Sequence, residues 1–120
     1  MDILVAEDNE DSRKLLTKQL RAFGHTVRGA ADGSKALAMA LETPPDVLVT
    51  DILMPVMDGF QLCMEWKTRP QLKDRPLVFY SATYTSDEDE KFAMSLGADA
   101  FIRKPAEIDE FLGTISEVVK

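Results

Sequence analysis

The stretch VTDILMPVMDGF, residues Val49–Phe60, raises the first question about this sequence, because a strand-forming run ends on a carboxylate. Val49 and Thr50 are β-branched residues that favour a strand, and Asp51 follows them directly. A carboxylate at the end of a buried strand is costly unless another group pairs with it, hydrogen-bonds it or coordinates it. The rest of the chain is therefore expected to bring such a group to Asp51.

Four further apolar runs resemble the segment before Asp51, and helical patterns separate all five. The expected strands are ILVAE (3–7), HTVRGA (25–30), DVLVT (46–50), PLVFY (76–80) and ADAFI (98–102). Apolar residues at helical spacing predict five helices. The first has a stripe of Leu16, Leu20 and Phe23 and is closed by Gly24, and the second is opened by Asp32-Gly33 and has a stripe of Ala36, Leu37, Ala40 and Leu41. The third and fourth are expected over 60–67 and 86–96, and the fifth has a stripe of Ile108, Phe111, Leu112, Ile115, Val118 and Val119. The segment Arg69–Arg75 is expected to be a polar loop.

Strands that alternate with helices through short loops are typical of βαβ units. The apolar runs are continuous instead of alternating with polar residues, which indicates strands covered on both faces. We therefore predict an α/β fold, in which a doubly wound five-stranded parallel sheet carries helices on both faces.

Composition limits the classes of protein to which the chain can belong. Its 120 residues are 45% hydrophobic, which predicts one domain spanning 1–120. No stretch approaches the roughly 20 apolar residues of a membrane span, and the acidic start MDILVAEDNE is unlike a secretory signal. One cysteine excludes an internal disulfide and a thiolate zinc cluster. These features favour a cytoplasmic protein, and the net charge of −7 argues against nucleic-acid binding.

Charged and polar residues follow the predicted strands at their carboxyl ends, where ligands bind in this type of sheet. These residues are Glu7-Asp8, Asp51, Ser81 and Lys104. Two carboxylates about 4 Å apart repel by roughly 4 kcal/mol at an effective dielectric constant of 20. Lys104 would offset part of this charge, and a divalent cation would offset the rest. Oxygen-only ligands suit Mg²⁺ or Mn²⁺.

Four motifs, in this order, carry a resemblance to a known family. They are VAEDN (5–9), TDILMPVMDG (50–59), YSA (80–82) and FIRKP (101–105). Over essentially its whole length the chain resembles the receiver domain of two-component response regulators, the CheY-like superfamily. The resemblance implies a flavodoxin-like sheet with strand order 2-1-3-4-5 and a signalling role instead of enzymatic turnover.

The resemblance also implies a role for each residue of the acidic cluster. Asp51 would be the phosphoacceptor, which receives its phosphoryl group from a phosphohistidine on a sensor histidine kinase or a histidine phosphotransfer protein. Asp8 would ligate Mg²⁺ (or Mn²⁺) directly, together with Asp51 and the backbone carbonyl of Leu53. Glu7 stands where many receivers have aspartate, and its longer arm would reach the metal through water.

Four residues in or after the fourth and fifth strands complete the implied site. Ser81 would hydrogen-bond a phosphoryl oxygen, and Lys104 would pair with another. Ser81 and the aromatic residue Phe101 would form the conformational switch. Pro105 would follow a cis peptide bond, although the chain lacks the aromatic residue that usually comes after this Lys-Pro pair.

Other functions fit the residues less well. An aspartyl-phosphate phosphatase of the haloacid dehalogenase type would carry a second aspartate at the position of Leu53, and a flavin-binding protein would not have the acidic loop EDNEDS (7–12). A pseudo-receiver that only binds partners is a third alternative. Receivers commonly signal through their fourth helix, fifth strand and fifth helix, so the resemblance also allows a homodimer that forms through that face. The chain could be a stand-alone regulator or part of a longer protein.

Overall fold

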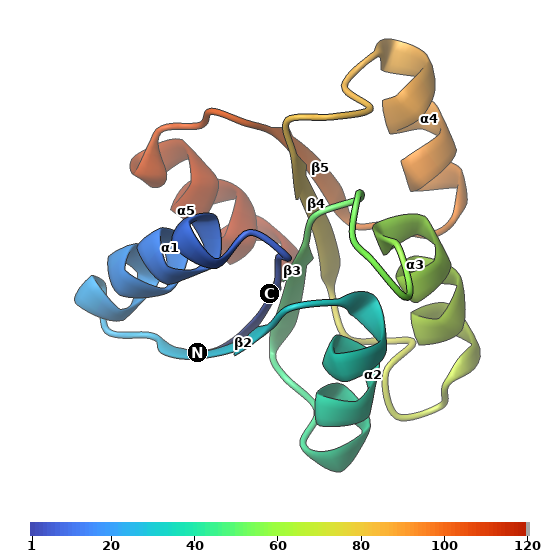
Figure 1. Ribbon diagram of the computed structural model, residues 1–120, viewed down its shortest axis with the longest axis horizontal. Helices are drawn as coiled ribbons and strands as arrows, with labels where there is room; N and C mark the ends of the chain where they lie inside the picture. The colour runs from blue at the N-terminus through green and yellow to red at the C-terminus, as the bar shows by residue number, and fades with distance from the viewer. Residues whose placement is uncertain (120) are drawn as a thin grey trace.

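A five-stranded parallel sheet forms the centre of the protein in a computed structural model, which describes residues 1–119 (Figure 1). The strand order is β2-β1-β3-β4-β5, as the resemblance implied. The strands are β1 (Asp2–Ala6), β2 (Thr26–Ala30), β3 (Val47–Thr50), β4 (Leu77–Ser81) and β5 (Ala100–Arg103). Because all pairs are parallel, the carboxyl ends of all five strands lie at one edge of the sheet.

Five helices cover the two faces of this sheet. Helices α1 (Glu10–Ala22) and α5 (Ile108–Val118) lie on one face, and α2 (Gly33–Glu42), α3 (Gly59–Thr68) and α4 (Asp87–Ser95) lie on the other (Figure 1). The predicted doubly wound α/β fold is therefore confirmed. Within residues 1–119, none of the helices has the length and apolar character needed to cross a membrane.

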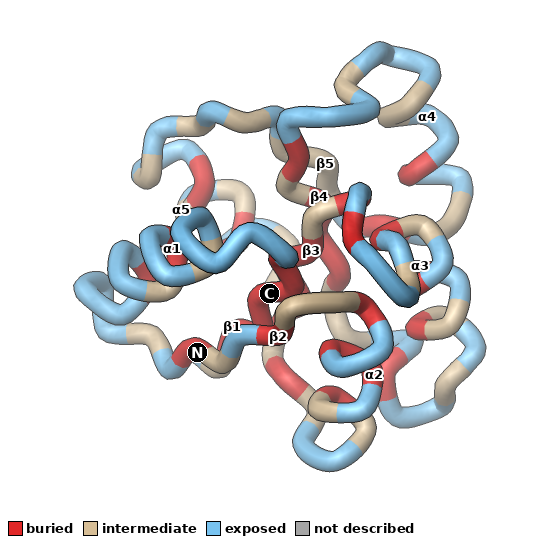
Figure 2. Tube along the Cα trace, in the orientation of Figure 1, coloured by how far each residue is buried: buried red, intermediate tan, exposed pale blue. Residues whose placement is uncertain are grey.

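Each strand supplies a core residue to both faces in turn, because successive side chains of a strand point to opposite sides. In β1, Ile3 and Val5 pack with α1 and α5, whereas Leu4 and Ala6 pack with α2 and α3. Buried residues follow the central strands in Figure 2. Burying one such Leu or Ile side chain contributes about 1.5–3 kcal/mol. One hydrophobic core on each face thus holds the sheet in place below the edge where the strands end.

Four of the helices begin at that polar edge with a side-chain cap. Asn9, Asp32, Asp58 and Ser86 each accept a hydrogen bond from the backbone N–H three residues further on. Ser86 and Asp89 form a reciprocal capping box at the start of α4. Such caps stabilise a helix start by about 1 kcal/mol and fix where the loop ends. They therefore fix the loops that surround the strand ends.

Most predicted bounds differ from the observed ones by about one residue, and two differences have a clear local cause. Helix α1 ends at Ala22, so Phe23 occupies the C-cap, 54% exposed, instead of extending the buried stripe. Gly24 follows with φ +89°, a backbone conformation that glycine adopts freely and that ends the helix. Strand β5 begins at Ala100 instead of residue 98, because at Asp99 the side-chain carboxylate, and not a backbone carbonyl, accepts the N–H of Leu77 (2.9 Å).

The expectation of a polar loop at 69–75 was wrong for one residue. Leu72 is fully buried in the core beside α3. The indole N–H of Trp66 donates to the Arg75 carbonyl (3.0 Å), which closes the loop over the Leu72 side chain. A single apolar residue among polar neighbours has no periodicity, so its burial could not be seen in the sequence.

Candidate functional site

Three carboxylates gather where β1 and β3 end. These strands are neighbours with Ala6 opposite Thr50, so the residues that follow them emerge side by side. Glu7, Asp8 and Asp51 each place a carboxylate oxygen within 4.8 Å of the others. Glu7 is buried, Asp51 is partly buried and Asp8 is exposed. The parallel topology thus creates the acidic cluster that the sequence predicted.

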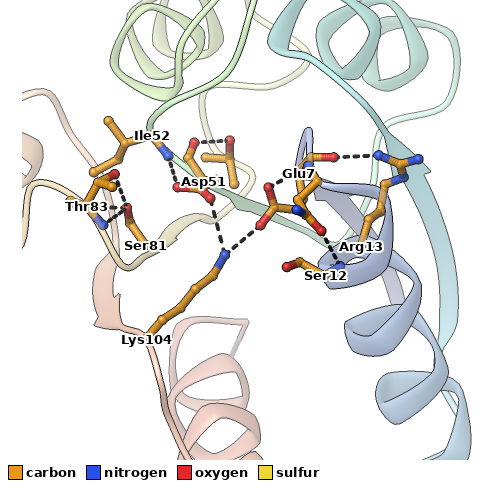
Figure 3. Close-up of polar contacts among 10 residues, drawn as sticks. Glu7, Ser12, Arg13, Asp51, Ile52, Ser81, Thr83 and Lys104 are labelled. Atoms are coloured by element: carbon orange, nitrogen blue, oxygen red, sulfur yellow. Dashed lines mark hydrogen bonds and ion pairs between the residues drawn. The ribbon is translucent and has the colours of Figure 1, made fainter.

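The Lys104 ammonium, which follows β5 at the edge of the sheet, bridges two of these carboxylates. Its Nζ lies 2.6 Å from Glu7 Oε1 and 3.2 Å from Asp51 Oδ2 (Figure 3). Burial acts to lower the pKa of Lys104, but the hydrogen bond to Glu7 and the charge of Asp51 outweigh it, so the pKa is raised. The ammonium therefore stays charged at neutral pH and offsets part of the cluster's negative charge.

The Asp51 carboxylate is held in one orientation by its own loop. Asp51 Oδ1 accepts the N–H of Ile52 (2.6 Å), which leaves Oδ2 to Lys104. The loop then turns back, and the N–H of Gly59 donates to the Ile52 carbonyl (2.7 Å). A Cβ at position 59 would collide with the backbone carbonyl oxygen of Asp51. The glycine of the MDG motif thus permits the close approach on which the Asp51 geometry depends.

The loop that carries Glu7 and Asp8 is fixed by a residue that the sequence did not single out. Arg13 of α1 donates from Nη1 to the Glu7 carbonyl (2.7 Å), and Glu7 Oε2 accepts the N–H of Asn9 (3.1 Å) (Figure 3). Arg13 also lies against Gly29, where a Cβ would be 3.2 Å from its Cδ. No spacing rule distinguishes Arg13 from the other basic residues of α1.

Ser81 lies at the end of β4, fully buried, but its hydroxyl is engaged elsewhere. Ser81 Oγ donates to the Thr83 carbonyl (2.7 Å) and accepts the N–H of Thr83 (3.1 Å). Figure 3 shows Ser81 and Thr83 on the opposite side of Asp51 from Glu7. Within residues 1–119, the Ser81 hydroxyl makes no hydrogen bond to Asp51 or to the Lys104 ammonium, so the structure does not join this hydroxyl to the charged cluster.

The remaining predicted site residues surround the cluster. The Leu53 side chain is 57% exposed in the β3–α3 loop and has no ligand atom, so only its backbone carbonyl could bind a metal ion. Phe101 is half-buried, with its ring 6.3 Å from that of Phe79. The peptide bond between Lys104 and Pro105 is cis, the form that the resemblance implied.

A cavity opens beside the charged cluster, between α1 and the segment that follows β5. Its volume is about 190 Å³. The lining combines charged groups with apolar walls and includes Glu7, Asp51, Lys104, Leu16, Tyr80 and Pro105. The cavity therefore borders two of the three clustered acidic residues, Glu7 and Asp51.

A parallel 2-1-3-4-5 sheet with an acidic cluster at its carboxyl edge defines a class of signalling module. Residues 3–116 match the response regulator receiver domain, and the chain belongs to this family of two-component systems. The acidic cluster is consistent with a phosphoacceptor site. As a class, receiver domains partner with histidine kinases.

The similar proteins are longer than this chain, so the similarity covers only part of each of them. The chain is 33% identical over 118 residues to the transcriptional regulatory protein YxdJ of Bacillus subtilis, which covers 98% of the chain and 50% of YxdJ. It is 38% identical over 103 residues to the response regulator PleD of Caulobacter vibrioides, with 86% of the chain and 22% of PleD covered. The chain thus spans half or less of these relatives.

Solved structures share the fold along nearly the whole chain. The chemotaxis protein CheY4 of Vibrio cholerae is 31% identical with a TM-score of 0.90, covering 98% of this chain and 97% of CheY4. The receiver domain of the sensor histidine kinase PA1611 of Pseudomonas aeruginosa, described with a magnesium ion coordinated in its active-site cleft, is 24% identical with a TM-score of 0.90, covering 98% and 96%. This second likeness concerns the fold alone.

Proposed function

We propose that this receiver domain accepts a phosphoryl group on Asp51 from a phosphohistidine and changes conformation in response. The observation that carries the proposal is the bridge from Lys104 to Glu7 and Asp51, 2.6 Å and 3.2 Å long, inside a cluster of three carboxylates. The donor is a sensor histidine kinase or a histidine phosphotransfer protein. The cytoplasmic location expected from the sequence remains a prediction.

The donor set of the cluster fits a divalent metal ion. Three carboxylates and one ammonium leave a formal charge of about −2, and all available ligand atoms are oxygens, which Mg²⁺ and Mn²⁺ prefer. Asp8, Asp51 and the backbone carbonyl of Leu53 would hold the ion directly, and Glu7 would hold it through water. When bound, Mg²⁺ supplies positive charge that offsets the carboxylate and phosphoryl oxygens.

The residues of the chain have complementary roles in the transfer. A bond forms between an Asp51 carboxylate oxygen and phosphorus while the bond from phosphorus to the imidazole nitrogen of the donor breaks, and the donor keeps that electron pair. Such a transition state is loose, so the protein contributes mainly alignment and charge neutralisation. The hydrogen bond from Ile52 orients the Asp51 carboxylate, and the Lys104 ammonium would pair with a phosphoryl oxygen.

The conformational response begins at Ser81. A phosphoryl group on Asp51 offers oxygens that compete with Thr83 for the Ser81 hydroxyl. Ser81 would then move inward, the β4–α4 loop would follow, and Phe101 would take the space that the loop leaves. A difference of a few kcal/mol between the two states is enough for such a switch. The changed surface would be that of α4, β5 and α5, where a downstream partner or a second copy of the chain would bind.

Intact mass spectrometry after incubation with acetyl phosphate tests the proposal. We expect wild type to gain one phosphoryl group only when Mg²⁺ is present, and Asp51→Asn to gain none. Asp74→Asn is the matched control, because Asp74 is an exposed loop carboxylate outside the cluster. A wild type that binds Mg²⁺ but takes up no phosphoryl group would refute the proposal in favour of a partner-binding pseudo-receiver. Repeated hydrolysis of phosphate esters would favour a phosphatase instead.

A further inference from the structure

Arg103, the last residue of β5, ties three parts of the molecule together. Its Nε donates to the Thr85 carbonyl in the β4–α4 loop (2.8 Å). Its Nη1 lies 2.7 Å from Glu90 Oε1, and its Nη2 lies 3.5 Å from Asp87 Oδ1. One guanidinium thus connects the edge strand of the sheet to the loop before α4 and to the first turn of α4.

The loop that Arg103 holds is the same loop that holds the Ser81 hydroxyl. Ser81 and Arg103 are direct partners in the pairing of β4 with β5, and the N–H of Lys104 donates to the Ser81 carbonyl (2.9 Å). The Ser81 hydroxyl exchanges two hydrogen bonds with the backbone of Thr83, two residues before Thr85. The loop is therefore fastened at both Thr83 and Thr85.

The residue between these two fastenings has an uncommon backbone conformation. Tyr84 has φ +53°, in the left-handed region that few residues other than glycine adopt. Such a conformation persists only where the surroundings hold it. Here the Tyr84 ring packs edge-on against Phe60, with centroids 5.9 Å apart, and Arg103 bonds the next residue. The contact from Arg103 is thus part of what keeps the loop in this arrangement.

Arg103 also covers the ring of Phe101. The guanidinium carbon lies 5.4 Å from the centroid of Phe101, two residues earlier on the same face of β5. A cation over an aromatic face is attracted to it, and the contact restrains the ring. The two groups that would move on activation, the β4–α4 loop and Phe101, are therefore both in contact with Arg103.

We propose that Arg103 is a positioning residue that holds the β4–α4 loop in the arrangement in which Ser81 bonds to Thr83, and thereby slows phosphoryl capture by Asp51. The inference rests on the proposed function. For the Ser81 hydroxyl to reach a phosphoryl oxygen on Asp51, it must give up its bonds to Thr83, so the loop must shift. The bond from Arg103 to Thr85 and the two ion pairs to α4 oppose that shift. Arg103 acts through the loop and does not itself touch the reacting atoms.

The test compares Arg103→Met with Arg69→Met. Methionine keeps an apolar stem of similar length but removes every hydrogen-bond donor. Arg69 forms a comparably exposed ion pair with Glu65 (3.3 Å) at the end of α3, and within residues 1–119 its hydrogen bonds and ion pair do not involve the β4–α4 loop. At saturating Mg²⁺, we expect Arg103→Met to be phosphorylated by acetyl phosphate about threefold faster than wild type. The Mg²⁺ concentration for half-maximal rate stays unchanged, and Arg69→Met keeps the wild-type rate.

The direction of the rate change separates positioning from mere structural support. If Arg103 only stabilised the fold, Arg103→Met would lower the Tm and leave the rate unchanged or reduce it, and that result would overturn the proposal. Glu90→Gln removes the ion pair between Arg103 and Glu90 by changing Glu90 and is also expected to accelerate phosphorylation, by a smaller factor. This second variant keeps the proposal testable if Arg103→Met does not fold.

Hydrogen exchange of the Thr83 amide gives a readout that does not depend on phosphorylation. That amide donates to Ser81 Oγ, so its exchange reports directly on the loop arrangement. We expect faster exchange at Thr83 in Arg103→Met than in wild type or Arg69→Met, and equal exchange would overturn the proposal. If no variant takes up a phosphoryl group, the proposed function fails, and the exchange rates still decide whether Arg103 holds the loop.

Discussion

The two sides of the acceptor site differ in how completely they are assembled. On the charged side, formed by Glu7, Asp51 and Lys104, hydrogen bonds and ion pairs already connect the groups. On the hydroxyl side, formed by Ser81 and the loop of Thr83–Thr85, the hydroxyl bonds to its own loop. The first side rests on the central strands β1 and β3, whereas the second leads into α4, of which only Ala93 is buried.

This difference indicates that binding and response can be controlled separately. A rigid charged side keeps the acceptor carboxylate ready without any rearrangement, which favours fast capture. A weakly packed hydroxyl side can change its arrangement at low cost, which a switch requires. Changes on the charged side should therefore alter stability most, and changes on the hydroxyl side should alter rates and local dynamics.

Removal of the Lys104 ammonium should give the largest loss of stability. Lys104→Met leaves the buried Glu7 carboxylate and Asp51 without their cation, so we expect a loss of about 3 kcal/mol in metal-free buffer at pH 7. Lys14→Met is the control, because the exposed pair of Lys14 with Glu10 contributes no more than about 0.5 kcal/mol. Urea unfolding measures both, and equal losses would contradict the assignment of the charged side as preassembled.

The contribution of Lys104 should also depend on pH in one direction. The raised pKa of Lys104 means that the folded protein holds this proton more tightly than the unfolded chain does. The stabilisation is therefore complete below the usual lysine pKa of about 10.4 and is lost as pH rises through the raised value. The stability difference between wild type and Lys104→Met, followed by urea unfolding, should shrink over that alkaline range.

A methyl group at Gly59 should disturb the charged side through the backbone. In Gly59→Ala, the new Cβ collides with the Asp51 carbonyl oxygen, so we expect a loss of about 1–3 kcal/mol and slower phosphorylation. Gly113→Ala is the control, because Gly113 lies within α5 with open space around its Cα, and alanine should stabilise that helix by about 0.5–1 kcal/mol. In thermal unfolding we expect the Tm to fall in Gly59→Ala and to rise in Gly113→Ala. An unchanged Tm in Gly59→Ala would show that the loop can shift to make room for the methyl group.

The sequence was sufficient to predict which groups meet at the sheet edge. Once the runs before Glu7 and Asp51 were recognised as parallel strands, their carboxyl ends had to lie together, and Lys104 had to follow the fifth strand to the same edge. The strand order came from the resemblance to receiver domains, because local patterns do not state which strands are neighbours. Leu72 was missed because burial of one residue in a loop leaves no periodic signal.

The orientation of Ser81 could not be predicted for a different reason. Its position at the end of β4 follows from the strand pattern, but its hydroxyl can turn to the site or to Thr83, and two competing hydrogen bonds decide between them. The contact of Arg103 with Phe101 could have been predicted from the sequence, because residues two apart in a strand lie on the same face of the sheet. Its bonds to Thr85 and Glu90 depend on how α4 is placed, which is tertiary information.

A change at Ser81 should have a smaller effect on stability than either change on the charged side. In Ser81→Ala, the N–H of Thr83 loses its acceptor, so we expect a loss of about 1 kcal/mol in urea unfolding. The same variant should show faster hydrogen exchange at Thr83 and slower phosphorylation by acetyl phosphate. Thr114→Ala is the control, because its hydroxyl bonds the Glu110 carbonyl on the exposed surface of α5. A loss above that of Gly59→Ala would show that the hydroxyl side is no weaker than the charged side.

The smallest expected effects concern backbone strain, which within residues 1–119 is found at one non-glycine residue in each of two loops beside the site. Val56 in the β3–α3 loop has φ +69° and is 81% exposed, whereas Tyr84 has φ +53° and packs against Phe60. Asparagine tolerates this left-handed conformation better than either residue. Val56→Asn loses no packing, so we expect a gain of about 0.5–1 kcal/mol in urea unfolding.

Tyr84→Asn relieves similar strain but forfeits an aromatic contact of about 0.5–1.5 kcal/mol, so the two terms should nearly cancel. A clear gain in Tyr84→Asn would mean that the ring contributes little and that the bond from Arg103 is the stronger of these two restraints on the loop. A clear loss, with Val56→Asn still stabilising, would mean that the aromatic contact is the stronger restraint. Either result ranks the two contacts that hold the hydroxyl side, and therefore identifies which of them must yield first when Ser81 turns toward Asp51.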